Sequence, residues 1–126
     1  MPELSGELRT LLVRHFDSVE SIEIVALLER SSSAFWTRQA ISQQLGIPEN
    51  VVESKLAALT ASEILVRGDL TGAYRFAPRS NELCERLLEL LRFYSEQRVI
   101  IINAIYSANL EKLRAFSDAF RLKKES

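Results

Sequence analysis

The chain has 126 residues, of which 47% are hydrophobic and 26% charged, so it can bury a core as one globular domain. Its formal net charge of −1 disfavours a strongly basic nucleic-acid binder, although basic groups can still gather on one face. One cysteine excludes an intrachain disulfide, and one cysteine with one histidine cannot form a structural zinc site within a single chain.

The N-terminal part predicts two helices. Leucines recur at helical spacing from Leu4 onward, and this pattern ends near Phe16. Asp17, with Glu20 three residues later, resembles a capping box and predicts a second helix over residues 18–30. The serines that follow are typical of a loop.

Two short helices and a tight turn are predicted next. Thr37 is a candidate N-cap for a helix over residues 38–45, and Gly46 is suited to the left-handed residue that ends it. Pro48 is suited to the start of a fourth helix that ends near residue 62. The inward stripe of that fourth helix consists of Val52, Leu56 and Leu59.

A small β-hairpin follows, with strands over residues 64–67 and 73–76 and a loop that has glycine at both ends. A long helix over 81–106 and a last helix over 109–123 complete the chain. The predicted fold is mainly α, of the α+β type, as a winged helix-turn-helix with a β-hairpin wing and long C-terminal helices. We expect a winged-helix domain in 1–80, including the N-terminal helix, and a helical dimerisation extension in 81–126, as one structural unit.

A helix-turn-helix commonly lays its second helix in the major groove of DNA. On the outward face of that helix, Asn50, Glu53 and Ser54 carry groups that can hydrogen-bond with base edges. Basic side chains from the same stretch would contact phosphates. These candidates are Arg38, Arg67 and Arg75.

The segment TRQAISQQLGIPENVVESKLAALTASEILVR, with the following YRFAP strand, resembles the bacterial winged-helix regulators, broadly the MarR-like group. The apolar residues of the segment fall where that family places its core, and the hairpin falls where it places its wing. The match covers roughly a third of the chain. It implies a homodimeric transcription regulator that binds a pseudo-palindromic site in double-stranded DNA.

The outward residues depart from that family. Ala57 and Ala58 stand where it carries longer polar or basic side chains, and Glu63 replaces the glycine that commonly ends this helix. From Thr37 to Pro78 the four basic residues are balanced by four acidic ones. The alternative is therefore a winged-helix protein–protein interaction module without direct DNA binding. Its contact face would include Val51, Ala58 and the long helix.

The long helix predicts self-association, because around Val99–Ile102 it is apolar on all sides and a helix of that kind must be buried all round. A second copy of the chain is the default cover. The alternative is a central core helix enclosed by the first and last helices of its own chain. The dimer-interface candidates are Leu87, Leu91, Tyr94, Ile100, Ile101 and Ile105.

No catalytic group is indicated. His15 has no nucleophile nearby in the sequence, and its place near a helix C-terminus favours a cation. Cys84 lies among leucines and is interpreted as a small buried hydrophobic residue. We therefore expect a protein that is not an enzyme and has no cofactor or metal. We also expect it to be cytoplasmic without membrane association, because the chain starts without a signal-like segment and its apolar runs are short.

Overall fold

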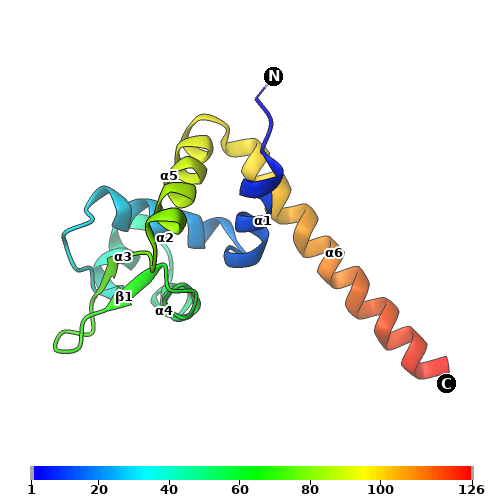
Figure 1. Ribbon diagram of the computed structural model, residues 1–126. Helices are drawn as coiled ribbons and strands as arrows, with labels where there is room; N and C mark the ends of the chain where they lie inside the picture. The colour runs from blue at the N-terminus through cyan, green and yellow to red at the C-terminus, as the bar shows by residue number, and fades with distance from the viewer. Residues whose placement is uncertain (1, 126) are drawn as a thin grey trace.

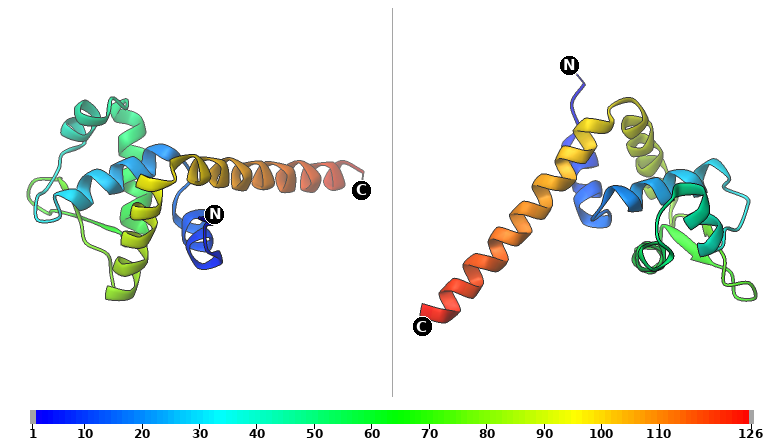
Figure 2. Two further views of the ribbon diagram at one scale, coloured as in Figure 1. Left: turned by 90° about the horizontal axis from the view of Figure 1, so that it is seen from above. Right: turned by 180° about the vertical axis from the view of Figure 1, so that it is seen from behind.

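The computed structural model describes residues 2–125, and the side chains of residues 2–121. This part of the chain is mainly helical and contains a small antiparallel sheet. A compact body carries one long helix that projects from it (Figures 1 and 2). The elements are α1 (Gly6–His15), α2 (Val19–Arg30), α3 (Arg38–Leu45), α4 (Glu49–Ala61), β1 (Leu65–Arg67), β2 (Tyr74–Phe76), α5 (Asn81–Glu96) and α6 (Arg98–Glu125).

The cap predicted for α2 is wrong by one residue. Ser18, and not Asp17, is the N-cap, and its hydroxyl accepts a hydrogen bond from the backbone N–H of Ser21 at 3.3 Å. The Asp17 carboxylate instead accepts from Nζ of Lys55 in α4, at 3.1 and 3.2 Å. Asp17 and Ser18 can both cap this helix, and Ser18 does so because the Asp17 carboxylate pairs with Lys55.

The turn between α3 and α4 has the predicted chemistry. The Thr37 hydroxyl accepts from the N–H of Ala40 at 3.1 Å, and Gly46 is left-handed with φ 69°. Pro48 immediately precedes α4. The stripe of Val52, Leu56 and Leu59 is buried, as the spacing predicts.

The hairpin pairs Leu65 with Phe76, Val66 with Arg75, and Arg67 with Tyr74. A short third segment joins its other edge, because Trp36 and Tyr74 exchange two backbone hydrogen bonds of 2.7 and 2.8 Å. Glu63, between α4 and β1, has φ 59°. This residue thus adopts the left-handed conformation that glycine adopts at lower cost, which explains why glycine would suit the position.

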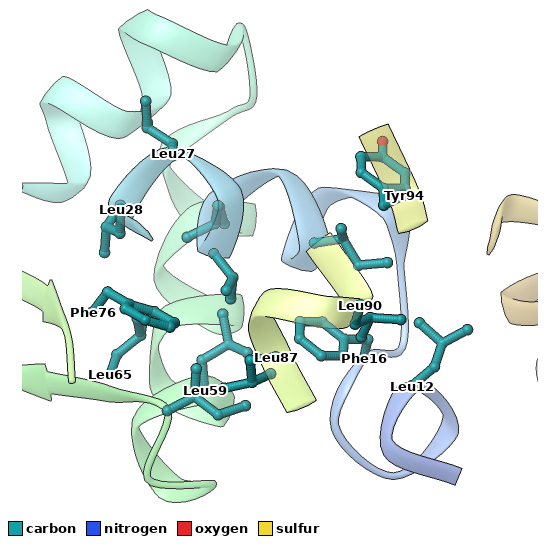
Figure 3. Close-up of a cluster of buried hydrophobic side chains, with 14 of the residues drawn as sticks. Leu12, Phe16, Leu27, Leu28, Leu59, Leu65, Phe76, Leu87, Leu90 and Tyr94 are labelled. Carbon is teal, nitrogen blue, oxygen red and sulfur yellow. The ribbon is translucent and has the colours of Figure 1, made fainter. Parts of the chain in front are cut away.

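One hydrophobic core joins the body, with buried side chains from α1, α2, α3, α4, the sheet, α5 and the first part of α6. Figure 3 shows Leu87 and Leu90 of α5 in the middle of this cluster, near Phe16, with Phe76 of the hairpin at its edge. The helix α1 packs against α5 and α6, whereas α2 packs against α3, α4 and β2. The core therefore fixes α4 and the hairpin relative to the C-terminal helices.

The C-terminal helices differ from the prediction in where they break. The expected break near residue 107 is absent, and α6 is one helix of 28 residues. The break lies at Gln97 (φ −133°, ψ 55°), where the apolar stripe of α5 is interrupted by the polar pair Gln97 and Arg98. The helix axis changes direction there, and α6 leaves the body (Figure 1).

An ionic contact with α2 holds this corner. The carboxylate of Glu23 accepts a hydrogen bond of 2.7 Å from the hydroxyl of Tyr94 and pairs with the guanidinium of Arg98. That guanidinium lies 5.0 Å from the centre of the Tyr94 ring. Burial, and then the bond to Glu23, raise the pKa of the Tyr94 hydroxyl, so it remains a hydrogen-bond donor at neutral pH.

The chain's own core encloses most of the dimer-interface candidates. Leu87, Tyr94, Ile101 and Ile105 are buried, and Leu91 and Ile100 are half-buried. Val99 is 68% exposed, so the chain's own core leaves this part of the apolar run uncovered. No described helix combines the length and apolar character needed to cross a membrane.

Candidate nucleic-acid interface

The outward face of α4 is fully accessible. Asn50, Glu53 and Ser54 are exposed there, with Ala57 and Ala58 beside them. The face projects because the buried stripe of α4 packs against α2 and α3 and holds the helix at the surface of the body. The helical period therefore predicted the placement of these three candidates correctly.

Arg38 does not point freely into solvent. Its guanidinium forms ion pairs with Glu49 at 3.4 Å and with Glu53 at 3.1 Å, so it links the start of α3 to the first two turns of α4. All three side chains are about half-exposed, which makes these pairs weak contributors to stability. Their main effect is to place two negative charges around the cation that would contact phosphate.

A hollow between α3, α4 and the hairpin brings Arg38 and Arg67 together with Glu53. The Arg67 side chain lies across the hairpin loop, where its Nη2 is 3.3 Å from the position that a Cβ would take on Gly72. The Cζ atom of Arg67 lies 6.0 Å from the centre of the Tyr74 ring. The hollow thus combines two guanidinium groups with the outward side of α4.

Arg75 lies apart from this group. Its partner across the sheet is Val66, whereas the partner of Arg67 is Tyr74, so the two arginines project from opposite faces of the hairpin. The Arg75 guanidinium lies 5.3 Å from the centre of the Phe35 ring, in the loop before α3. The register therefore places Arg67 beside the hollow and Arg75 on the other face of the hairpin.

Polar residues that the sequence analysis did not single out also line the hollow. They include Gln39, Thr71 and Tyr74, each with a group that can hydrogen-bond with a phosphate or a base. Tyr74 could have been found from the sequence. Residues two apart on a strand share a face, so Tyr74 shares the face of the buried Phe76 and, across the hairpin, that of Arg67.

The only histidine lies outside this interface, in the last turn of α1. Burial, followed by the charges of Arg14 and Arg79, lowers the pKa of His15 below its ordinary value of 6.5. In the described part of the chain, its Nδ1 atom is buried and has no hydrogen-bond partner. The expected preference for a cation at this helix end is thus outweighed by burial and by two arginines.

The lowered pKa predicts a pH dependence of stability. The fold favours the neutral imidazole, so its contribution is fully present above the unfolded value near 6.5 and is lost as the pH falls through 6.5 toward the folded pKa. Urea unfolding at about pH 7.5 and about pH 5.5 should show lower stability at the acidic value, with a smaller difference in His15→Gln. An equal pH dependence in both proteins would contradict this assignment.

Comparison of the chain with protein-family models, with curated proteins and with solved structures found no match. Function therefore has to be inferred from the side chains themselves.

Proposed function

We propose that α2, α3, α4 and the hairpin form a winged helix-turn-helix, and that the protein binds double-stranded DNA as a homodimeric transcription regulator. The observation that carries this proposal is the exposed face of α4 with Asn50 and Ser54, beside a hollow that contains Arg38 and Arg67. The order of elements supports the winged-helix part, including the short pairing of Trp36 with β2 before α3.

In this proposal α4 enters the major groove. Asn50 can pair with an adenine edge, and Ser54 can hydrogen-bond at short range. Arg67 would contact the phosphate backbone that flanks the groove, together with polar groups of the hollow. Glu53 has two roles, since it can accept from a cytosine amino group and it also holds Arg38 by an ion pair of 3.1 Å.

The experiment is a salt titration of binding to random-sequence duplex DNA, followed by fluorescence anisotropy. We expect binding at about 50 mM salt with a steep dependence on salt concentration. Arg67→Gln should reduce the slope by about one phosphate contact. Arg75→Gln removes the same charge from the opposite face of the hairpin and should leave the slope unchanged.

Glu53→Gln should tighten binding, because it removes a negative charge from the interface and releases Arg38 from one of its two ion pairs. A gain of about 1 kcal/mol, or roughly fivefold in affinity, is expected for one unit charge in water. Glu20→Gln, which makes the same charge change on α2, is the matched control. Absence of DNA binding at about 50 mM salt would refute the proposal.

The second candidate function is a protein-interaction module. It is favoured by apolar exposure on the hairpin, where Leu70 at the tip is 100% exposed and Val66 is 42% exposed. Asp69 beside Leu70 also opposes insertion of this tip into a negatively charged minor groove. In that case Arg67→Gln and Glu53→Gln would have no consistent effect on DNA affinity.

A further inference from the structure

The second half of α6 projects beyond the body (Figures 1 and 2). Asn109 still contacts the body, since its Nδ2 donates to the backbone oxygen of Asp17 at 3.1 Å. All described residues from 109 to 121, here called the arm, are exposed. An isolated helical segment of this length is only marginally stable in water.

The arm carries a continuous apolar stripe. Leu110, Leu113 and Phe116 follow one another at intervals of three residues and are 36%, 61% and 70% exposed. The stripe continues toward the body through Tyr106 and Val99, which are 65% and 68% exposed. A solvent-exposed stripe of this length is typical of a helix that packs against a partner.

A second apolar stripe lies on α5, beside the stripe that enters the core. It consists of Leu88, which is 38% exposed, with Cys84 and Leu91, which are half-buried and also pack against the core. The helix α6 departs from the end of α5 in another direction (Figure 1), and Leu88 remains exposed. One chain thus presents two separate apolar helix surfaces.

The charges beside these stripes are opposite. On the arm, the helical period places Arg114 and Arg121 on one side of the stripe. Lys112 lies on the other side and lines a hollow of its own chain beside Asp17 and Lys55. On α5, Arg92 lies next to the stripe, and Glu89 already pairs with Arg86 of its own chain at 2.6 Å. Beyond Arg92, exposed acidic residues follow at the same period. These are Glu85, Glu89 and Glu96. In a pair of chains, the basic residues of one arm can therefore lie near the acidic residues on α5 of the other chain.

The lengths also agree, since residues 109–125 of α6 and the 16 residues of α5 each span about 25 Å. We propose that the arm of each chain packs along α5 of a second copy, in a two-fold symmetric exchange. The contact between an arm and α5 then occurs twice, once in each direction, so the dimer leaves neither surface free for a third chain. This inference rests on the proposed function only in that the pair would present two α4 helices to one DNA duplex.

An anionic membrane surface is the other occupant that a basic amphipathic helix suggests. The charge pattern favours the second copy. Glu111 and Asp118 lie on the side of the arm away from the stripe, and the matching acidic surface is present on every chain. Vesicle binding is therefore treated as an outcome of the test.

Engineered cysteines test the contact, because Cys84 is the only native cysteine. One chain carries Cys84→Ser with Leu88→Cys. A second, differently tagged chain carries Cys84→Ser with Phe116→Cys, or with Leu113→Cys. After mixing and mild oxidation, a mixed disulfide dimer should form, since the bond requires Cα atoms within about 7 Å. We expect it to be at least tenfold more abundant than with Glu111→Cys or Asp118→Cys, which lie on the other side of the arm.

Light scattering should also show a wild-type mass of two chains. A monomeric wild type at tens of micromolar, or equal cross-linking from both sides of the arm, would overturn the proposal. Cross-linking of Phe116→Cys only with itself would show arm-to-arm pairing and would also overturn it. Binding to vesicles that contain anionic phosphatidylserine, without formation of the mixed dimer, would favour the membrane instead. None of these readouts requires DNA. Failure of the arm contact can therefore be distinguished from failure of DNA binding.

Discussion

We expect the Ile101→Ala variant to lose about 2–5 kcal/mol of unfolding free energy, as is usual when a buried isoleucine is truncated. Ile101 is fully buried in the core of its own chain, in the first turn of α6. The loss includes the transfer energy of the removed carbons and the cavity that remains. Urea unfolding followed by circular dichroism measures the loss.

Ile100→Ala is the matched control, since the neighbouring isoleucine is only half-buried and should cost about 1 kcal/mol or less. Both variants should be measured at two protein concentrations, because the apparent stability of a dimer depends on concentration. If Ile101 lay mainly in a dimer interface, Ile101→Ala would weaken dimerisation. The measured unfolding free energy would then depend more strongly on protein concentration, and the stability of the single chain would change little. That result would contradict its place in the core.

The second large effect is expected from the arm. Leu113→Glu combined with Phe116→Glu places two charges in the exposed apolar stripe and near the acidic residues of the proposed α5 partner surface. The variant should be monomeric by light scattering, and its DNA affinity should fall about 100-fold or more, because two linked binding units are reduced to one. The circular dichroism of the body should change little, since both side chains are exposed.

Ala115→Glu combined with Ala119→Glu adds the same two charges to the other side of the arm and should remain dimeric. A dimeric Leu113→Glu, Phe116→Glu variant would be incompatible with the arm exchange. A monomeric variant with unchanged DNA affinity would separate the two proposals, because pairing would then be dispensable for binding.

The elements set by local chemistry could be predicted from the sequence. The N-cap at Thr37, the left-handed Gly46 and the position of Pro48 depend on interactions within a few residues, so α3 and α4 begin and end where expected. The helical period also identified the buried and outward faces of α4. The α2 cap was missed because Asp17 and Ser18 are both competent, and a contact with the distant Lys55 distinguishes them.

The C-terminal helices show what a one-dimensional pattern cannot supply. The break at Gln97 has neither proline nor glycine, and it is accompanied by contacts of Tyr94 and Arg98 with Glu23, more than 70 residues earlier in the chain. The apolar run of α6 indicated burial but not the covering partner. The chain's own core buries Ile101, whereas Val99 stays exposed.

The candidate interface could be predicted only where it depends on local sequence pattern. Outward residues of one helix follow from its period, whereas the environment of each arginine depends on contacts between elements. Arg38 in α3 is held by two acidic residues of α4. The separation of Arg67 from Arg75 follows from strand register, which the alternation of Tyr74, Arg75 and Phe76 would have indicated.

The short pairing of Trp36 with Tyr74 makes tryptophan fluorescence a probe of how the hairpin sits relative to α3. Trp36 is the only tryptophan in the sequence, and its backbone is hydrogen-bonded to the hairpin immediately before α3 begins. In the part of the chain that the structure describes, its buried indole nitrogen has no hydrogen-bond partner. Indole emission depends on polarity and hydrogen bonding, so any ligand that shifts the hairpin relative to α3 should change the fluorescence of the unlabelled protein.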